Sequence, residues 1–113
     1  MSVVAHNIEN DIHFLTFPSH IAQDEYEDIF SGIYTTIGDP AKIRLIVDLS
    51  SMDYINSGFI GMMSELFSVT VDDGWWQMVI VANTILEDMF KLVGFNDFVE
   101  IVWDKNAALS LLS

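Results

Sequence analysis

The most informative stretch of this sequence runs from Leu45 to Met63 and reads LIVDLSSMDYINSGFIGMM. Its first residues form an apolar, β-branched run, which predicts a buried strand. Polar and small residues follow, of the kinds that allow a chain to turn at little cost. Beyond them, the apolar residues recur at helical spacing: Phe59, Met62, Met63, Leu66 and Phe67. The stretch therefore predicts a strand, a tight turn and a helix that begins near Ser57.

Ser57 has two possible roles at the start of that helix. Free backbone N–H groups and the helix dipole favour negative charge there, so a phosphate on Ser57 would be well placed. Serine and asparagine are also preferred N-cap residues, so Ser57, or Asn56 before it, can act simply as the cap. The residues alone leave both interpretations open.

The composition predicts one folded domain, residues 1–113, because 51% of the residues are hydrophobic and the length allows one real core. Seventeen acidic residues outnumber four cationic ones, which gives a net charge of −13. Such a chain repels DNA and RNA, whose binding needs clustered Lys and Arg. An anionic membrane surface is disfavoured for the same reason. A basic protein partner, in contrast, would be steered towards the chain.

The sequence carries none of the usual signs of an enzyme or a metal site. It has no cysteine, no Gly-rich phosphate loop, no GxSxG elbow and no HExxH pair. His6, His13 and His20 lack metal-ligand spacing. We therefore expect no enzymatic activity, no catalytic residue, no metal and no cofactor. The start of the chain shows no signal peptide and no apolar run is long enough to span a membrane, so we expect a cytoplasmic protein.

Strand and helix patterns alternate along the chain. The expected strands are two short strands or a hairpin within residues 3–17 and single strands at residues 43–49, 75–82 and 98–102. The expected helices end before Gly38, run from Ser57 to Val69 or Val71, run from an Asn83–Thr84 cap to Gly94, and follow an Asp104 cap. The order ββ-α-β-α-β-α-β-α predicts an α/β fold with a mixed, partly parallel sheet packed against helices.

Several side chains can be assigned to a face. His13 alternates with Ile12 and Phe14, so it is expected to face solvent. Trp75 and Trp76 must point to opposite faces of their strand, so one is available for the core, and the other is available for binding or for edge packing. Asp48 is expected to be a turn or capping acid and not a catalytic one. In the third helix, Ile85, Met89 and Leu92 are expected on one apolar face with Phe90 beside it, and in the last helix Ala107, Ala108, Leu111 and Leu112 are expected to pack inwards.

The first helix has one apolar and one acidic face. Its apolar residues recur with helical period at Tyr26, Ile29, Phe30, Ile33 and Ile37. The opposite face carries Asp24, Glu25, Glu27 and Asp28. Both a solvated face and a docking surface for a basic partner agree with this pattern.

The stretch from Leu45 to Gly61 resembles the signature of STAS domains, which include the bacterial anti-sigma factor antagonists. Their motif runs roughly D-L-S-x-V-x-[FY]-[IM]-D-S-[ST]-G-[IL]-G. Here Asn56 replaces the motif Asp, Gly58 the Ser or Thr, and Phe59 the Gly. The later segments 79–83, 89–95 and 107–109 also resemble the family, and the expected order of elements agrees with its fold.

The resemblance implies a function in partner switching. In that family the serine at the position of Ser57 is phosphorylated by a serine kinase of the histidine-kinase-like ATPase fold, often itself an anti-sigma factor. A metal-dependent serine phosphatase reverses the modification. The unphosphorylated protein binds the kinase, and phosphorylation breaks the complex. The implied partner-binding residues are Asp53, Asn56, Ser57, Gly58, Phe59 and Met62.

Two other functions remain open, as does the oligomeric state. The first is a STAS adaptor or scaffold in which Ser57 serves only as a cap. The second is a module that binds a small anionic ligand or nucleotide at the helix N-terminus, although only Lys42 and Arg44 lie close to it in sequence.

Overall fold

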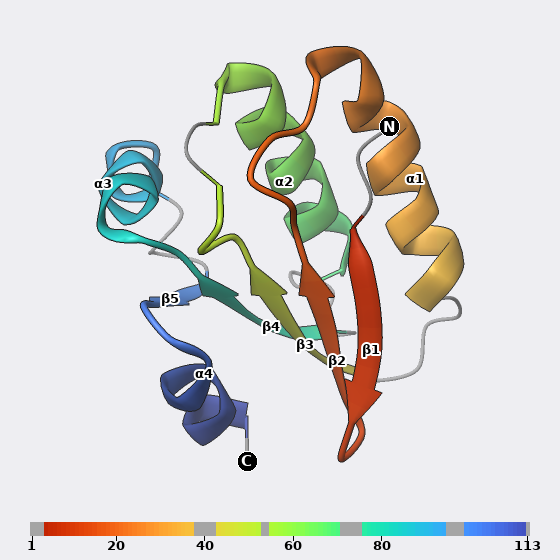
Figure 1. Ribbon diagram of the computed structural model, residues 1–113, viewed down its shortest axis with the longest axis vertical. Coiled ribbons are helices and arrows are strands. Elements are labelled where there is room, and N and C mark those ends of the chain that lie inside the picture. The colour runs from red at the N-terminus through yellow and green to blue at the C-terminus, as the bar shows by residue number, and fades with distance from the viewer. Residues whose placement is uncertain (1–3, 38–42, 53–54, 71–75, 95–98, 113) are drawn as a thin grey trace.

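The computed structural model describes residues 4–37, 43–52, 55–70, 76–94 and 99–112, which form a five-stranded sheet covered by helices on both faces (Figure 1). The strands are β1 (Ala5–Glu9), β2 (Ile12–Thr16), β3 (Ile43–Asp48), β4 (Trp76–Val81) and β5 (Glu100–Val102). The helices are the 3₁₀ turn η1 (Gln23–Glu25), α1 (Tyr26–Ile37), α2 (Ser57–Thr70), α3 (Thr84–Leu92) and α4 (Lys105–Leu112). The predicted α/β fold and element order are confirmed.

The strands lie in the order β1-β2-β3-β4-β5, with β1 antiparallel to β2 and all other neighbours parallel. Because parallel strands end at the same edge, the segments that lead into α1, α2, α3 and α4 all leave the sheet at its carboxyl edge. That edge therefore collects four helix beginnings, including the one at Ser57.

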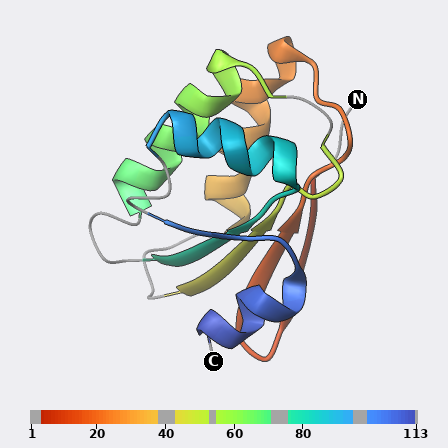
Figure 2. The ribbon, with the colours of Figure 1, turned by 90° about the vertical axis from the view of Figure 1, so that its left-hand side faces the viewer.

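Side chains that alternate along the strands build two cores. Helices α1, α2 and α3 cover one face of the sheet and α4 covers the other (Figure 2). The larger core, under α1, α2 and α3, takes strand residues such as Leu15, Leu45, Val47, Met78 and Ile80. The smaller core, under α4, consists of Ile12, Phe14, Ile46, Val79, Val81, Ala108 and Leu112. Burial on both faces explains why the strand at 43–49 has an almost unbroken apolar sequence.

Phe59 in α2 is the centre of an aromatic cluster in the larger core. Its side chain is 0% exposed. Its ring centroid lies 5.8 Å from that of Phe17, 5.5 Å from that of Tyr26 and 5.6 Å from that of Phe30, each in an edge-to-face arrangement. Such pairs are favourable beyond the area that they bury. The cluster therefore holds the first turn of α2 against α1 and the end of β2.

The side-chain faces of the last two helices differ in part from the expectation. Leu86 and Phe90 are the buried residues of α3, whereas Ile85 and Leu92 are 66% and 87% exposed. Two apolar stripes run along α3, and the stripe that contains Leu86 is the one buried in the larger core. In α4, Ala108 and Leu112 are buried as expected, but Leu111 is 51% exposed.

His13 also differs from the expectation. It faces away from Ile12 and Phe14, as predicted, but it is only half-exposed because it stacks on His6, with ring centroids 5.2 Å apart. Nε2 of His6 and Nδ1 of His13 lie 3.0 Å apart and share one hydrogen bond. Burial and, to a smaller extent, the neighbouring His6 lower the pKa of His13. Trp75 lies outside the described residues, as does the side chain of Trp76.

The helix starts and ends agree with the predicted signals. Oδ1 of Asp104 accepts a hydrogen bond from the backbone N–H of Ala107 at 2.7 Å, so Asp104 caps α4 as expected. Gly94, which follows α3, has a φ of 82°, the left-handed conformation typical of a helix C-terminus. In the described part of the chain, none of the helices combines the length and the apolar character needed to cross a bilayer.

The hairpin between β1 and β2 generates the first testable prediction. Its two turn residues, Asn10 and Asp11, have φ angles of 51° and 65°, as in a two-residue hairpin turn. Glycine is the best residue at the second position, so Asp11→Gly is expected to raise the free energy of unfolding by about 0.5 kcal/mol. Urea denaturation measures the change.

Asp11→Asn is the matched control, because it removes the same charge and still tolerates a positive φ. If Asp11→Asn stabilises the protein as much as Asp11→Gly, charge and not backbone conformation is the cause. A β-branched residue is strained at this φ, so Asp11→Val should destabilise the protein, and no loss in that variant would contradict the turn geometry.

Candidate functional site

The site lies at the carboxyl edge of the sheet, where the chain passes from β3 to α2. Oδ1 of Asp48 accepts hydrogen bonds from the backbone N–H of Ser50 at 2.9 Å and from its hydroxyl at 2.6 Å. The backbone N–H of Met52 donates to the carbonyl of Leu49 at 3.0 Å. Asp48 therefore stabilises the turn after β3, the role expected from the sequence.

Asn83 connects this turn to the next helix. Its Oδ1 accepts from the backbone N–H of Leu86 at 2.9 Å, which caps α3. Its Nδ2 donates to the carbonyl of Met52 at 2.9 Å and lies 3.5 Å from that of Ser50. One amide thus caps α3 and also holds the β3–α2 connection. The sequence predicted the cap but not this second bond, because Asn83 and Met52 are 31 residues apart.

Asn56 caps α2. Its Oδ1 accepts a hydrogen bond from the backbone N–H of Phe59 at 2.9 Å, and its carbonyl accepts from the N–H of Ile60 at 3.1 Å. Of the two capping candidates, the structure selects Asn56. Ser57 is consequently the first residue of the helix, and its side chain is exposed. Among the described residues, no group forms a hydrogen bond with the Ser57 hydroxyl.

Gly58 fits a narrow space beside the cap. A Cβ atom at this position would lie 3.3 Å from Oδ1 of Asn56 and 3.5 Å from Cε2 of Tyr26. The first distance is tighter than ordinary van der Waals contact, so a Ser or Thr here would press on the cap. Gly58 therefore leaves the Asn56 cap undisturbed.

The proposed partner-binding residues do not all reach the surface. Ser57 is exposed, and Asn56, Gly58 and Met62 are partly buried. The side chain of Phe59 is 0% exposed and belongs to the core, so in this structure it cannot contact a partner. Asp53 lies outside the described residues.

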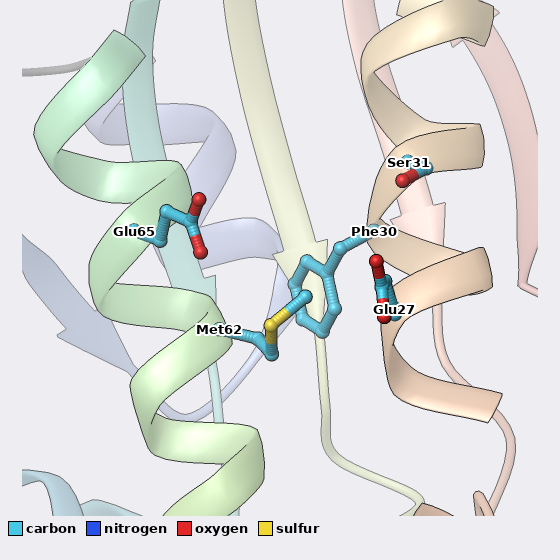
Figure 3. A pocket seen from close by; sticks show the side chains of 5 residues that line it. All are labelled: Glu27, Phe30, Ser31, Met62 and Glu65. Carbon is cyan, nitrogen blue, oxygen red and sulfur yellow. The ribbon is translucent and has the colours of Figure 1, made fainter. Parts of the chain in front are cut away.

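A groove of about 230 Å³ runs between α1 and α2 on the outer side of these helices (Figure 3). It is lined by Glu27, Phe30 and Ser31 from α1 and by Met62 and Glu65 from α2. Met62 and Phe30 point towards each other, and the carboxylates of Glu27 and Glu65 lie on either side of them. Met62, which the resemblance assigns to partner binding, therefore lies in an apolar groove with acidic borders.

Metal-binding geometry is not found in the described part of the chain, where no three His, Asp or Glu side chains gather as a cation would require. The arrangement at the start of α2 is suited to binding and to modification of a hydroxyl. It presents an exposed hydroxyl at a helix N-terminus, where the dipole favours negative charge.

Stability measurements can test whether Asn56 or Ser57 caps α2. Asn56→Ala removes the cap of α2 and is expected to lower the free energy of unfolding by about 1 kcal/mol. Ser57→Ala removes a hydroxyl without a described partner and is expected to change it by less than about 0.5 kcal/mol. Asn56→Asp keeps an acceptor at the cap and serves as the control. A larger loss in Ser57→Ala than in Asn56→Ala would assign the cap to Ser57 instead.

The second role of Asn83 can be separated from its capping role. Asn83→Asp retains the oxygen that caps α3 but loses the N–H₂ group that donates to Met52. It is expected to lower the free energy of unfolding by about 1 kcal/mol or more, because a carboxylate then faces a carbonyl. Thr84→Asp adds the same charge at the next residue and is the control. Equal stability of Asn83→Asp and wild type would show that the bond to Met52 contributes nothing.

Solved structures share this fold closely, although no protein-family model and no curated protein matches the sequence. An anti-sigma factor antagonist from Mycobacterium paratuberculosis superposes with a TM-score of 0.80 at 12% identity, over 98% of this chain and 93% of the other. A putative anti-sigma factor antagonist from Thermotoga maritima gives 0.81 at 15% identity, over 95% and 92%. A STAS domain protein from Planctomyces limnophilus gives 0.79 at 14% identity, over 97% and 98%. The chain therefore has the fold of the STAS domain, as the sequence motif indicated.

Proposed function

We propose that this chain is a phospho-regulated partner-switching protein of the anti-sigma factor antagonist type. It binds a serine kinase that also acts as an anti-sigma factor while Ser57 is unphosphorylated, and phosphorylation of Ser57 releases it. A metal-dependent serine phosphatase restores the binding form. The chain itself is a binding protein and not an enzyme, and it works in the cytoplasm, where the kinase has ATP.

The position of Ser57 is the observation that supports this proposal most strongly. Its hydroxyl is exposed at the first residue of α2, and Asn56 already provides the cap. A kinase can therefore use the hydroxyl without breaking a described hydrogen bond of the fold. The phosphate would then stand at a helix N-terminus, where it is favoured electrostatically.

The size of the charge change indicates a local mechanism. A phosphate adds about −1.5 to −2 charges. Against a net charge of −13, this changes the overall field of the protein little. A dianion at a surface that is covered by a partner is different, because burying it without a cation costs several kcal/mol. Release therefore follows from desolvation of the phosphate at the contact and not from long-range repulsion.

The direct test uses the immobilised protein, extract from its native cells and Mg·ATP. Wild type should retain the kinase and release it when ATP is added, because phosphorylation of Ser57 breaks the complex. Ser57→Ala should retain the kinase and keep it after ATP addition, whereas Ser57→Glu should bind at least about tenfold less of it, a difference of about 1.4 kcal/mol. Quantitative mass spectrometry of the retained proteins measures each outcome.

Thr84 provides matched controls, because it is an exposed hydroxyl residue at the first position of α3 and directly follows an asparagine cap. Thr84→Ala and Thr84→Glu should behave as wild type. ATP-driven release from Ser57→Ala would contradict the proposal. Retention of the same partners by wild type and Ser57→Glu would favour an adaptor that does not depend on phosphorylation.

A further inference from the structure

The groove between α1 and α2 is lined by residues further along the helix that begins at Ser57. Glu65 lies eight residues after Ser57 in α2, which corresponds to about 12 Å along the helix. On the other side, Tyr26 at the start of α1 contacts Phe59 and lies next to Gly58. A partner that covers Ser57 can therefore extend along both helices and reach the groove.

The groove offers an apolar floor and charged borders. Phe30 is 2% exposed and Met62 is partly buried, so their side chains form the floor, whereas Glu27 and Glu65 are exposed. The volume of about 230 Å³ is several times the roughly 30 Å³ of one liquid water molecule. It can therefore accept a whole side chain.

The described cations of the chain are engaged elsewhere. Arg44 donates to the carbonyls of Leu112 and Asn10. Lys91 pairs with Glu87 within α3, and Lys105 lies 3.5 Å from Glu9 and over the ring of Phe14. Within the part of the chain that the structure describes, no Lys or Arg forms an ion pair with Glu27 or Glu65. The groove thus keeps two carboxylates available for a cation from outside.

We infer that this groove binds a lysine or arginine side chain of the partner. The aliphatic stem of such a residue packs on Phe30 and Met62, and its charged end lies between the two carboxylates, as expected for side chains that bury the stem and solvate the charge. Neutral side chains lack the ionic contact with the two carboxylates, and acidic side chains are repelled by them. The inference rests on the proposed function, because that function places the partner on α2, and it adds the chemistry that the partner must present.

The test uses a short peptide, N-acetyl-Gly-Arg-Gly-amide, and the full chain with ¹³C-labelled methionine methyl groups. The chain has six methionines, and Met62→Leu identifies the Met62 signal. The arginine peptide should shift the Met62 methyl signal saturably at concentrations up to about 20 mM. The same peptide with citrulline, which has the same shape without the charge, should not.

The carboxylates are tested by a double variant and a charge-matched control. Glu27→Gln with Glu65→Gln should weaken peptide binding by about fivefold or more, because both exposed pairs are lost. Asp88→Asn with Glu100→Gln removes the same total charge on α3 and β5, which do not line the groove, and should weaken binding by less than about twofold. Equal weakening in both double variants, equal shifts with citrulline, or no Met62 shift with the arginine peptide would each overturn the inference.

The groove and the switch can fail separately. Ser57→Glu should leave arginine-peptide binding within about twofold of wild type, because Ser57 does not line the groove and salt screens an exposed charge at this position. If the peptide binds but ATP never releases the kinase, the inference about the groove is supported and the proposed phosphorylation switch is refuted. If ATP releases the kinase but the peptide never shifts the Met62 methyl signal, the proposed switch is supported and the inference about the groove is refuted.

Discussion

The packing of the buried Phe59 ring is the interaction on which the rest of the site depends. Its ring packs edge-to-face against Phe17, Tyr26 and Phe30, which joins the residue after β2 to α1 and α2 in one buried cluster. Because the ring cannot leave the core, the first turn of α2 has a fixed rotation. Ser57 precedes Phe59 by two residues, about 200° around the helix axis, so it is turned towards solvent. The backbone N–H of Phe59 donates a hydrogen bond to Oδ1 of Asn56, so the Ser57 hydroxyl is not part of the cap.

The acidic surface influences which kinds of partner approach the site. A net charge of −13 attracts basic partners over a distance and disfavours nucleic acid and anionic lipid. Specific contacts must add to this general attraction, since surface charges are screened by salt. The groove further along α1 and α2 combines an apolar floor with two carboxylates, which is the basis for the inferred preference for a long cationic side chain. In the proposed mechanism, attraction depends on the net charge, recognition on the groove and release on Ser57.

The order of strands and helices could be predicted because each element carries a clear period and clear end signals. The apolar run before Asp48, the Asp104 cap and Gly94 all act locally, and the structure contains each of them as expected. The packed face of α3 could not be predicted. Ile85 with Leu92 and Leu86 with Phe90 form two apolar stripes, and only the approach of α3 to the sheet decides which one is buried.

Contacts between distant residues account for the other differences. The stacking of His13 on His6 depends on the register of the hairpin, and the bond from Asn83 to Met52 depends on the packing of α3 beside the β3–α2 turn. The groove needs Glu27 and Glu65, which lie on helices separated by β3 in the chain. In the site itself, Ser57 is exposed and Met62 is partly buried, and their roles in phosphorylation and partner binding stay predictions. Phe59, which the resemblance also assigned to partner binding, is enclosed by the aromatic cluster.

The most direct test of the central claim is phosphosite mass spectrometry of the protein isolated from its native cells with phosphatases inhibited, beside a strain that carries Ser57→Ala. The account predicts one phosphate on Ser57, absent from the variant, with a changed phenotype in that strain. An unmodified Ser57 under conditions in which the kinase is active would contradict the account and leave the chain as a constitutive binding protein.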